Sequence, residues 1–117
     1  VSETRQKPVQ ALIFVGDAME EDPTTLNRIA GQLGLLGVPV FMFQDGSDPI
    51  AGRAFRDVSR LSNGAYCRFD ATSPERLRDL LCAVAVFAVG GHKALKNYSQ
   101  THGDAVAQLA HQVDKTR

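Results

Sequence analysis

Short apolar runs alternate with helical patterns between residues 9 and 91, and this alternation restricts the fold more than any other feature. The runs at 9–15, 38–43 and 65–69 are rich in β-branched and aromatic residues, as the buried strands of parallel sheets are. We expect the third strand to be the weakest, because Arg68 lies within it. Strands that alternate with helices through short connections predict right-handed crossovers and a parallel sheet covered by helices.

The segments between these runs have the three- and four-residue spacing of amphipathic helices. We expect helices from Pro23 to about Leu36, from Pro49 to the Asn63-Gly64 pair, and from Pro74 to the Gly90-Gly91 pair. Asp48 is placed to cap the second helix, whose apolar stripe is predicted to include Ile50, Phe55 and Val58.

Residues 92–117 differ in pattern from the rest of the chain. Leu95 and Tyr98 precede the polar stretch SQTHGD, and Val106, Leu109 and Val113 follow it, which predicts one or two further helical pieces. At 117 residues and 44% hydrophobic composition, the chain is long enough for one core. We therefore expect one α/β domain at 1–91 and a C-terminal helical tail at 92–117 that docks or frays.

Charge and cysteine usage exclude several classes of function. Thirteen basic residues balance thirteen acidic ones, so the chain has no net positive charge that would attract nucleic acid or an anionic membrane. No apolar stretch approaches the roughly 20 residues of a membrane span, and no signal peptide is recognisable, so a cytoplasmic location is expected. Cys67 and Cys82 are expected to be reduced core thiols, and the three histidines have no zinc-site spacing.

The residues of several motifs, and the order in which the motifs occur, resemble the C-terminal half of a von Willebrand factor A (VWA) domain, as in bacterial VWA domain-containing proteins. These motifs are a strand that ends in Gly16-Asp17, the strand GVPVFMF, the strand NGAYCRFD and the helix SPERLRDLL. The resemblance covers about Val9 to Val89. It implies a three-layer, Rossmann-like parallel sheet with helices on both faces, and a non-enzymatic module that binds a partner protein.

The resemblance also implies a metal site at the carboxyl ends of the strands. Asp17 matches the aspartate of the third metal-binding loop, which in the family helps to hold Mg²⁺ or Mn²⁺. Gly16, Asp45, Asp48 and Asp70 are expected on the same rim of the sheet. Gly16 lacks the hydroxyl that often precedes this aspartate, and the 117 residues contain no DxSxS motif. Tight metal binding is therefore expected only when an N-terminal half supplies the missing ligands.

The same resemblance makes a prediction about the first strand. In the family it lies near the middle of the sheet, so in this chain 9–15 would present an apolar edge with unpaired backbone groups. We expect that edge to be covered either by the N-terminal half or by the same strand of a second copy in a homodimer.

Two other interpretations remain open at this point. A flavodoxin-like or receiver-like domain would use Asp17 as a phosphoryl acceptor or catalytic carboxylate, although the late strand offers Arg68 where a receiver has lysine. Alternatively, the carboxylates close turns and cap helices in a purely structural fragment. The chain has no G-x-S-x-G, Walker A or G-x-G-x-x-G motif. The sequence therefore lacks the motifs on which hydrolase, P-loop and dinucleotide-binding functions depend.

Overall fold

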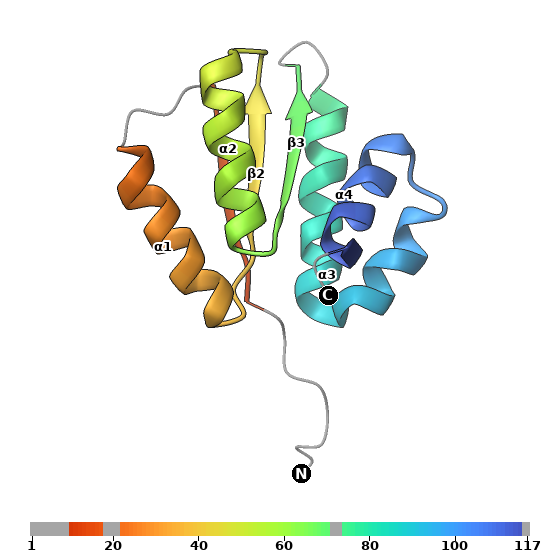
Figure 1. Ribbon diagram of the computed structural model, residues 1–117. Coiled ribbons are helices and arrows are strands. Elements are labelled where there is room, and N and C mark those ends of the chain that lie inside the picture. Colours follow the sequence, from red (N-terminus) through yellow and green to blue (C-terminus); the bar gives the residue numbers. More distant parts are fainter. Residues whose placement is uncertain (1–9, 18–21, 71–73, 116–117) are drawn as a thin grey trace.

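The computed structural model describes residues 10–17, 22–70 and 74–115, which form three parallel strands and four helices (Figure 1). The elements follow one another as β1 (Leu12–Gly16), α1 (Pro23–Leu35), β2 (Val40–Asp45), α2 (Pro49–Leu61), β3 (Ala65–Phe69), α3 (Pro74–Ser99) and α4 (Asp104–Lys115). The predicted α/β class and the strand–helix alternation are confirmed.

The sheet has the strand order β1-β2-β3, and both neighbouring pairs are parallel. Leu12 pairs with Val40 in the first ladder, and Met42 pairs with Tyr66 in the second. β2 is therefore the central strand, and β1 and β3 are the two edges of the sheet that the described residues form.

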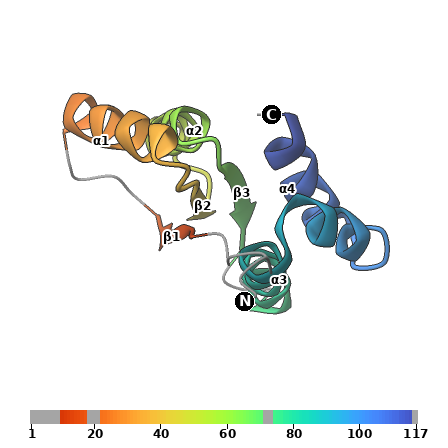
Figure 2. The same cartoon turned by 90° about the horizontal axis from the view of Figure 1, so that it is seen from below.

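Helices cover both faces of the sheet, as predicted, because the side chains of β2 alternate between two apolar clusters. Val40 and Met42 pack against residues of α1 and α2, whereas Phe41 and Phe43 pack against residues of α3 and α4. Figure 2 shows α1 and α2 together on one side of the strands and α3 on the other. This layered arrangement is compatible with a Rossmann-like fold.

Two of the predicted strand boundaries were wrong. The first strand was expected at 9–15, but β1 begins at Leu12 and includes Gly16; position 9 lies outside the described residues. The second was expected at 38–43, but β2 runs from Val40 to Asp45, because the preceding Pro39 has no N–H to give to a ladder. The third strand, 65–69, lies where it was predicted.

Local capping signals set the helix ends. The Asp48 carboxylate accepts a hydrogen bond from the Ile50 N–H at 3.0 Å and caps α2, as expected. Asp22 caps α1 in the same way, through the Thr25 N–H. After α2, Asn63 takes a left-handed conformation with φ 65°, and α3 is kinked at Gly91, where φ is 78°. The predicted breaks at the Asn-Gly and Gly-Gly pairs are therefore confirmed.

Two expectations about burial need correction. Ile50 was placed on the buried stripe of α2, but its side chain is 82% exposed, because it lies in the first turn beyond the edge of the cluster around Phe55. Cys82 was expected in the core and is exposed on α3. Of the two alternatives for residues 92–117, docking or fraying, the described part docks: Leu95 and Val106 are buried in the same cluster as Phe41.

None of the helices in the described ranges is both long enough and apolar enough to cross a membrane.

Candidate functional site

Four of the predicted site residues lie at the carboxyl end of the sheet. Gly16 is the last residue of β1 and Asp17 follows it, exposed to solvent. Asp45 is the last residue of β2, and the exposed Asp70 follows β3. Parallel strands bring their carboxyl ends to one rim, where ligands of open α/β sheets usually bind. The sequence therefore placed these residues on the correct rim.

The rim does not by itself assemble a metal centre. Within residues 10–17, 22–70 and 74–115, no three His, Cys, Asp or Glu side chains lie close enough together to hold a metal ion. Asp48 is already engaged as the cap of α2. Two acids that follow Asp17 in the sequence, Glu20 and Glu21, lie outside the described residues. Asp17 thus offers one carboxylate, and a hard divalent cation requires about six oxygen ligands.

The edge strand β1 is the most unusual surface of the molecule. Its four large apolar side chains, Leu12, Ile13, Phe14 and Val15, are 49%, 43%, 39% and 45% exposed. The apolar run predicted a strand buried on both faces, whereas the family resemblance predicted an apolar edge in this chain. Both faces of β1 are half open, in agreement with the second prediction. β1 also carries no proline or lysine, two common devices that block pairing at an edge.

The backbone of β1 is paired on one side only. The Leu12 N–H donates to the Pro39 carbonyl at 3.0 Å, so Leu12 faces β2. Because successive residues of a strand alternate in direction, the N–H and C=O groups of Ile13 and Val15 point away from the sheet. Neither residue has a hydrogen-bond partner for these groups in the described part of the chain.

An apolar groove of about 300 Å³ runs along β1 on the side of α1. Its walls include Leu12 and Phe14 from β1, Ile29 from α1 and Val58 from α2. Phe14 contacts Phe55 of α2 edge-to-face, with ring centroids 5.3 Å apart, and thereby holds β1 against the core. The groove shows that α1 covers this face of β1 only in part.

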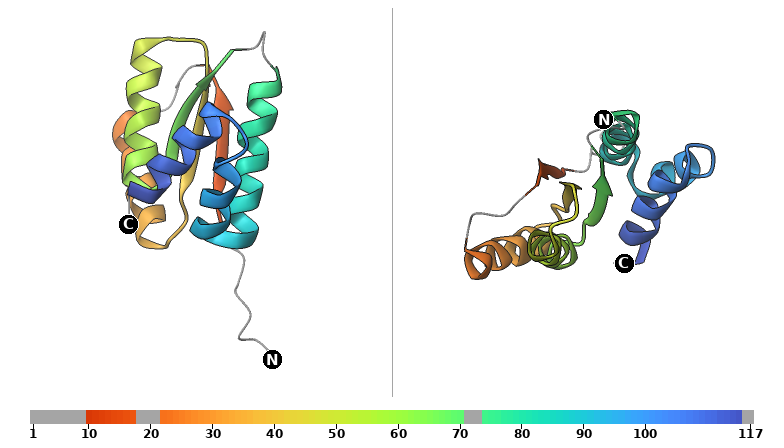
Figure 3. Two further views of the ribbon diagram at one scale, coloured as in Figure 1. Left: turned by 90° about the vertical axis from the view of Figure 1, so that its right-hand side faces the viewer. Right: turned by 90° about the horizontal axis from the view of Figure 1, so that it is seen from above.

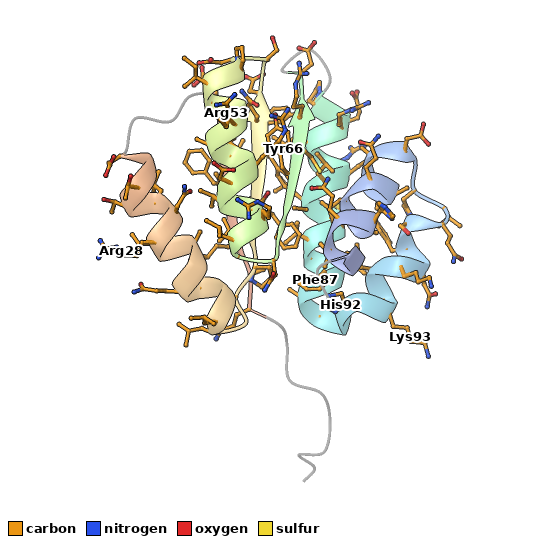
Figure 4. The ribbon with its side chains drawn as sticks, in the orientation of Figure 1. Arg28, Arg53, Tyr66, Phe87, His92 and Lys93 are labelled. Atoms are coloured by element: carbon orange, nitrogen blue, oxygen red, sulfur yellow. The ribbon has the colours of Figure 1, made fainter. Side chains whose placement is uncertain are left out.

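A second pocket, of about 270 Å³, lies between the first turns of α2 and the ends of β2 and β3. Arg53 and Arg56 of α2 and Arg68 of β3 line it together with Tyr66. Figure 4 shows Arg53 and Tyr66 on the neighbouring elements α2 and β3. The Tyr66 hydroxyl donates a hydrogen bond to the side-chain oxygen of Gln44, a residue only 1% exposed.

Sequence reasoning missed this arginine pocket. Arg68 was interpreted as a residue that weakens its strand and as the residue that stands where a receiver has lysine, and the helical arginines were not considered. A signal was present, because Arg53 and Arg56 are three residues apart and therefore on one face of the helix that begins at the rim. Their proximity to Arg68 depends on the pairing of β2 with β3, which local spacing does not reveal.

The two thiols differ in environment. Burial raises the pKa of the Cys67 thiol from 9.0 to about 12, and the positive charge of Arg76 lowers it in part. Cys82 is exposed. His92, His102 and His111 are all exposed, as expected, and the His102 ring stacks on Tyr98 at 3.7 Å.

Comparison with known proteins adds no family to this description. No protein-family model, no curated protein and no solved structure matches the chain.

Proposed function

We propose that the chain is a non-enzymatic protein-interaction module, the second half of a VWA-type sheet, which docks a complementary α/β segment along β1. The observation that carries the proposal is the half exposure of every large apolar side chain of β1, on both faces of the strand. Burial of apolar surface contributes roughly 25 cal/mol per Å², so such a strand gains free energy when another strand and its helices cover it.

The backbone supports the same proposal. The outward N–H and C=O groups of Ile13 and Val15 form a template for one more strand. In the VWA-type arrangement, this added strand belongs to the N-terminal half and runs parallel to β1.

The exposed faces favour an α/β partner over a second copy of the chain. Ile13 pairs with Phe41 and Val15 pairs with Phe43, so their side chains lie on the α3 face of the sheet. On that face α3 packs against β2 and β3, and Figure 2 shows it away from β1. Antiparallel pairing of two β1 strands would leave Ile13 and Val15 of both copies uncovered, whereas an α/β segment brings a helix to cover them.

Asp17 supports a role for a cation in this complex. It lies at the carboxyl end of β1, beside the position that the added strand would occupy. The docked segment would then supply the remaining oxygen ligands for Mg²⁺ or Mn²⁺, and the chain by itself would bind these ions weakly.

A photo-crosslinking experiment tests the proposal. The photoreactive residue p-benzoylphenylalanine replaces Val15 in the chain expressed in its native host, and crosslinked peptides are identified by mass spectrometry. The matched control places the same residue at Val89, an apolar position on α3 that is 78% exposed. We expect position 15 to crosslink a segment in which an Asp-x-Ser-x-Ser sequence follows a strand, and position 89 to remain free of that product.

Crosslinks between two copies of this chain at position 15 would identify a homodimer and overturn the proposal. Equal yields at positions 15 and 89 would also overturn it. Calorimetric titration of the captured complex with Mn²⁺ tests the cation separately: the heat of binding should disappear in Asp17→Ala, and the crosslink at position 15 should persist.

A further inference from the structure

The arginine pocket has a strong excess of positive charge. Three guanidinium groups line it, from Arg53, Arg56 and Arg68, and a single carboxylate, that of Asp48, lines it with them. No ion pair to these three arginines is formed by any described residue. Arg60, on the same helix, differs from them because it pairs with Asp57 at 3.6 Å. Among the described residues, the pocket therefore has an excess of about two positive charges, in a chain whose net charge is zero.

Two of the three guanidinium groups are already held in place. Arg56 lies over the Tyr66 ring, 4.8 Å from its centroid, and Nε of Arg68 donates to the Gly46 carbonyl at 3.0 Å. Tyr66 is itself fixed by its hydrogen bond to the buried Gln44. An anion that binds between these arginines loses less free energy to side-chain ordering than it would at mobile surface arginines.

A glycine at the base of the pocket keeps it open. A Cβ atom at Gly52 would lie 3.2 Å from Oε1 of Gln44 and 3.4 Å from the Tyr66 hydroxyl oxygen. It would also lie 3.7 Å from Nη1 of Arg56. Any larger side chain at position 52 would thus occupy the space that the arginines surround.

We propose that this pocket binds the phosphoryl group of a small phosphate monoester. Such a group carries about −1.5 to −2 charges at neutral pH, which matches the excess positive charge of the pocket. Its three terminal oxygens can accept hydrogen bonds from several guanidinium groups at once, whereas one arginine fork satisfies a carboxylate. The volume of about 270 Å³ lies just below the roughly 300–1,000 Å³ of typical ligand pockets, so the ligand is small.

The site lies on the α2 face of the sheet, where the side chains of Ile13 and Val15 do not point. The inference is therefore independent of the proposed docking along β1, and either one can fail without the other.

Isothermal titration calorimetry with glycerol 3-phosphate at low salt tests the site. We expect saturable binding that weakens about tenfold or more in Arg53→Gln, since a hydrogen bond to a charged group contributes about 1.5–3 kcal/mol and 1.4 kcal/mol is tenfold. Arg60→Gln, on the same helix but outside the pocket, is the matched control and should change the affinity less than about threefold. Gly52→Leu fills the pocket at constant charge and should abolish binding.

Two further measurements identify the ligand chemistry. The affinity should rise between pH 5.5 and 7.5, because the second pKa of a phosphate monoester is about 6. Acetate should bind at least about tenfold more weakly than glycerol 3-phosphate. Circular dichroism confirms that each variant is folded, which Arg53→Gln should be because its side chain is exposed. The absence of saturable heat, equal weakening in Arg60→Gln, or acetate binding as strong as that of the phosphate ester would each overturn the proposal.

Discussion

The side-chain amide of Gln112 on α4 pairs with both backbone polar groups of Tyr66 on β3. The Tyr66 N–H donates to Oε1 of Gln112 at 2.8 Å, and Nε2 of Gln112 donates to the Tyr66 carbonyl at 2.8 Å. One side chain thus takes the place of a neighbouring strand at this edge of the sheet. Figure 3 shows α4 lying beside β3, which protects that edge, whereas no described residue covers the edge of β1 in this way.

This pairing predicts a measurable loss of stability when it is removed. Gln112→Leu leaves the backbone groups of Tyr66 without partners in a half-buried position, which costs about 1–3 kcal/mol for an unsatisfied group. Urea unfolding should show a lower free energy of unfolding with an unchanged slope. Gln108→Leu, an exposed position on the same helix, is the control and should change stability by less than about 0.5 kcal/mol. Equal losses in both variants would show that the Gln112 amide is not the cause.

The open edge of β1 predicts an alternating pattern of amide hydrogen exchange. In dilute solution the N–H groups of Ile13 and Val15 should exchange much faster than that of Phe14, which the alternation of the strand directs toward β2. Two-dimensional NMR measures the three amides in one experiment, so Phe14 is an internal control. Slow exchange at Ile13 and Val15 in a monomeric sample would mean that the edge is already paired.

The different exposure of the two cysteines predicts selective labelling. Cys82 is exposed and should react with a thiol reagent such as Ellman's reagent at pH 8 in the folded protein. Cys67 is 8% exposed with a raised thiol pKa, so it should react only after unfolding. Mass spectrometry should therefore find one label under native conditions and two in urea. Rapid labelling of Cys67 in the folded Cys82→Ala variant would contradict its burial.

The raised pKa of Cys67 also predicts how stability depends on pH. The thiol ionises near 9.0 in the unfolded chain and near 12 in the folded one, so its contribution is complete below pH 9 and is lost as the pH rises toward 12. Within that window the free energy of unfolding should fall by up to about 1.4 kcal/mol per pH unit because of this group. The difference between the wild type and Cys67→Ala isolates the effect, because other groups titrate equally in both. Parallel pH profiles would contradict the assignment.

Features that depend on neighbouring residues in the sequence were predicted well. The cap at Asp48, the left-handed turn at Asn63 and the break at Gly91 each follow from the chemistry of one or two residues. The apolar runs predicted all three strands, with end positions wrong by up to three residues for β1. Ile50 was misplaced because periodicity describes a helix face and does not show how far the neighbouring core extends along it.

Features that depend on distant residues could not be predicted in the same way. Gln112 and Tyr66 are 46 positions apart in the chain, and the sequence around each residue does not predict the hydrogen bonds between them. Arg53 and Arg68 share a pocket only because β2 and β3 are adjacent and α2 crosses between them.

The sequence by itself determined the order of strands and helices, the places where the helices begin and break, and the rim on which Asp17 lies. Hydrophobic periodicity and helix capping involve residues that are only a few positions apart, so both can be recognised in a single sequence. Only the tertiary structure decided that α4 covers the edge of β3, that no described element covers the edge of β1, and that three arginines surround one pocket. The physical reason is that edge coverage and charge clustering arise when packed elements bring together residues that are far apart in the chain.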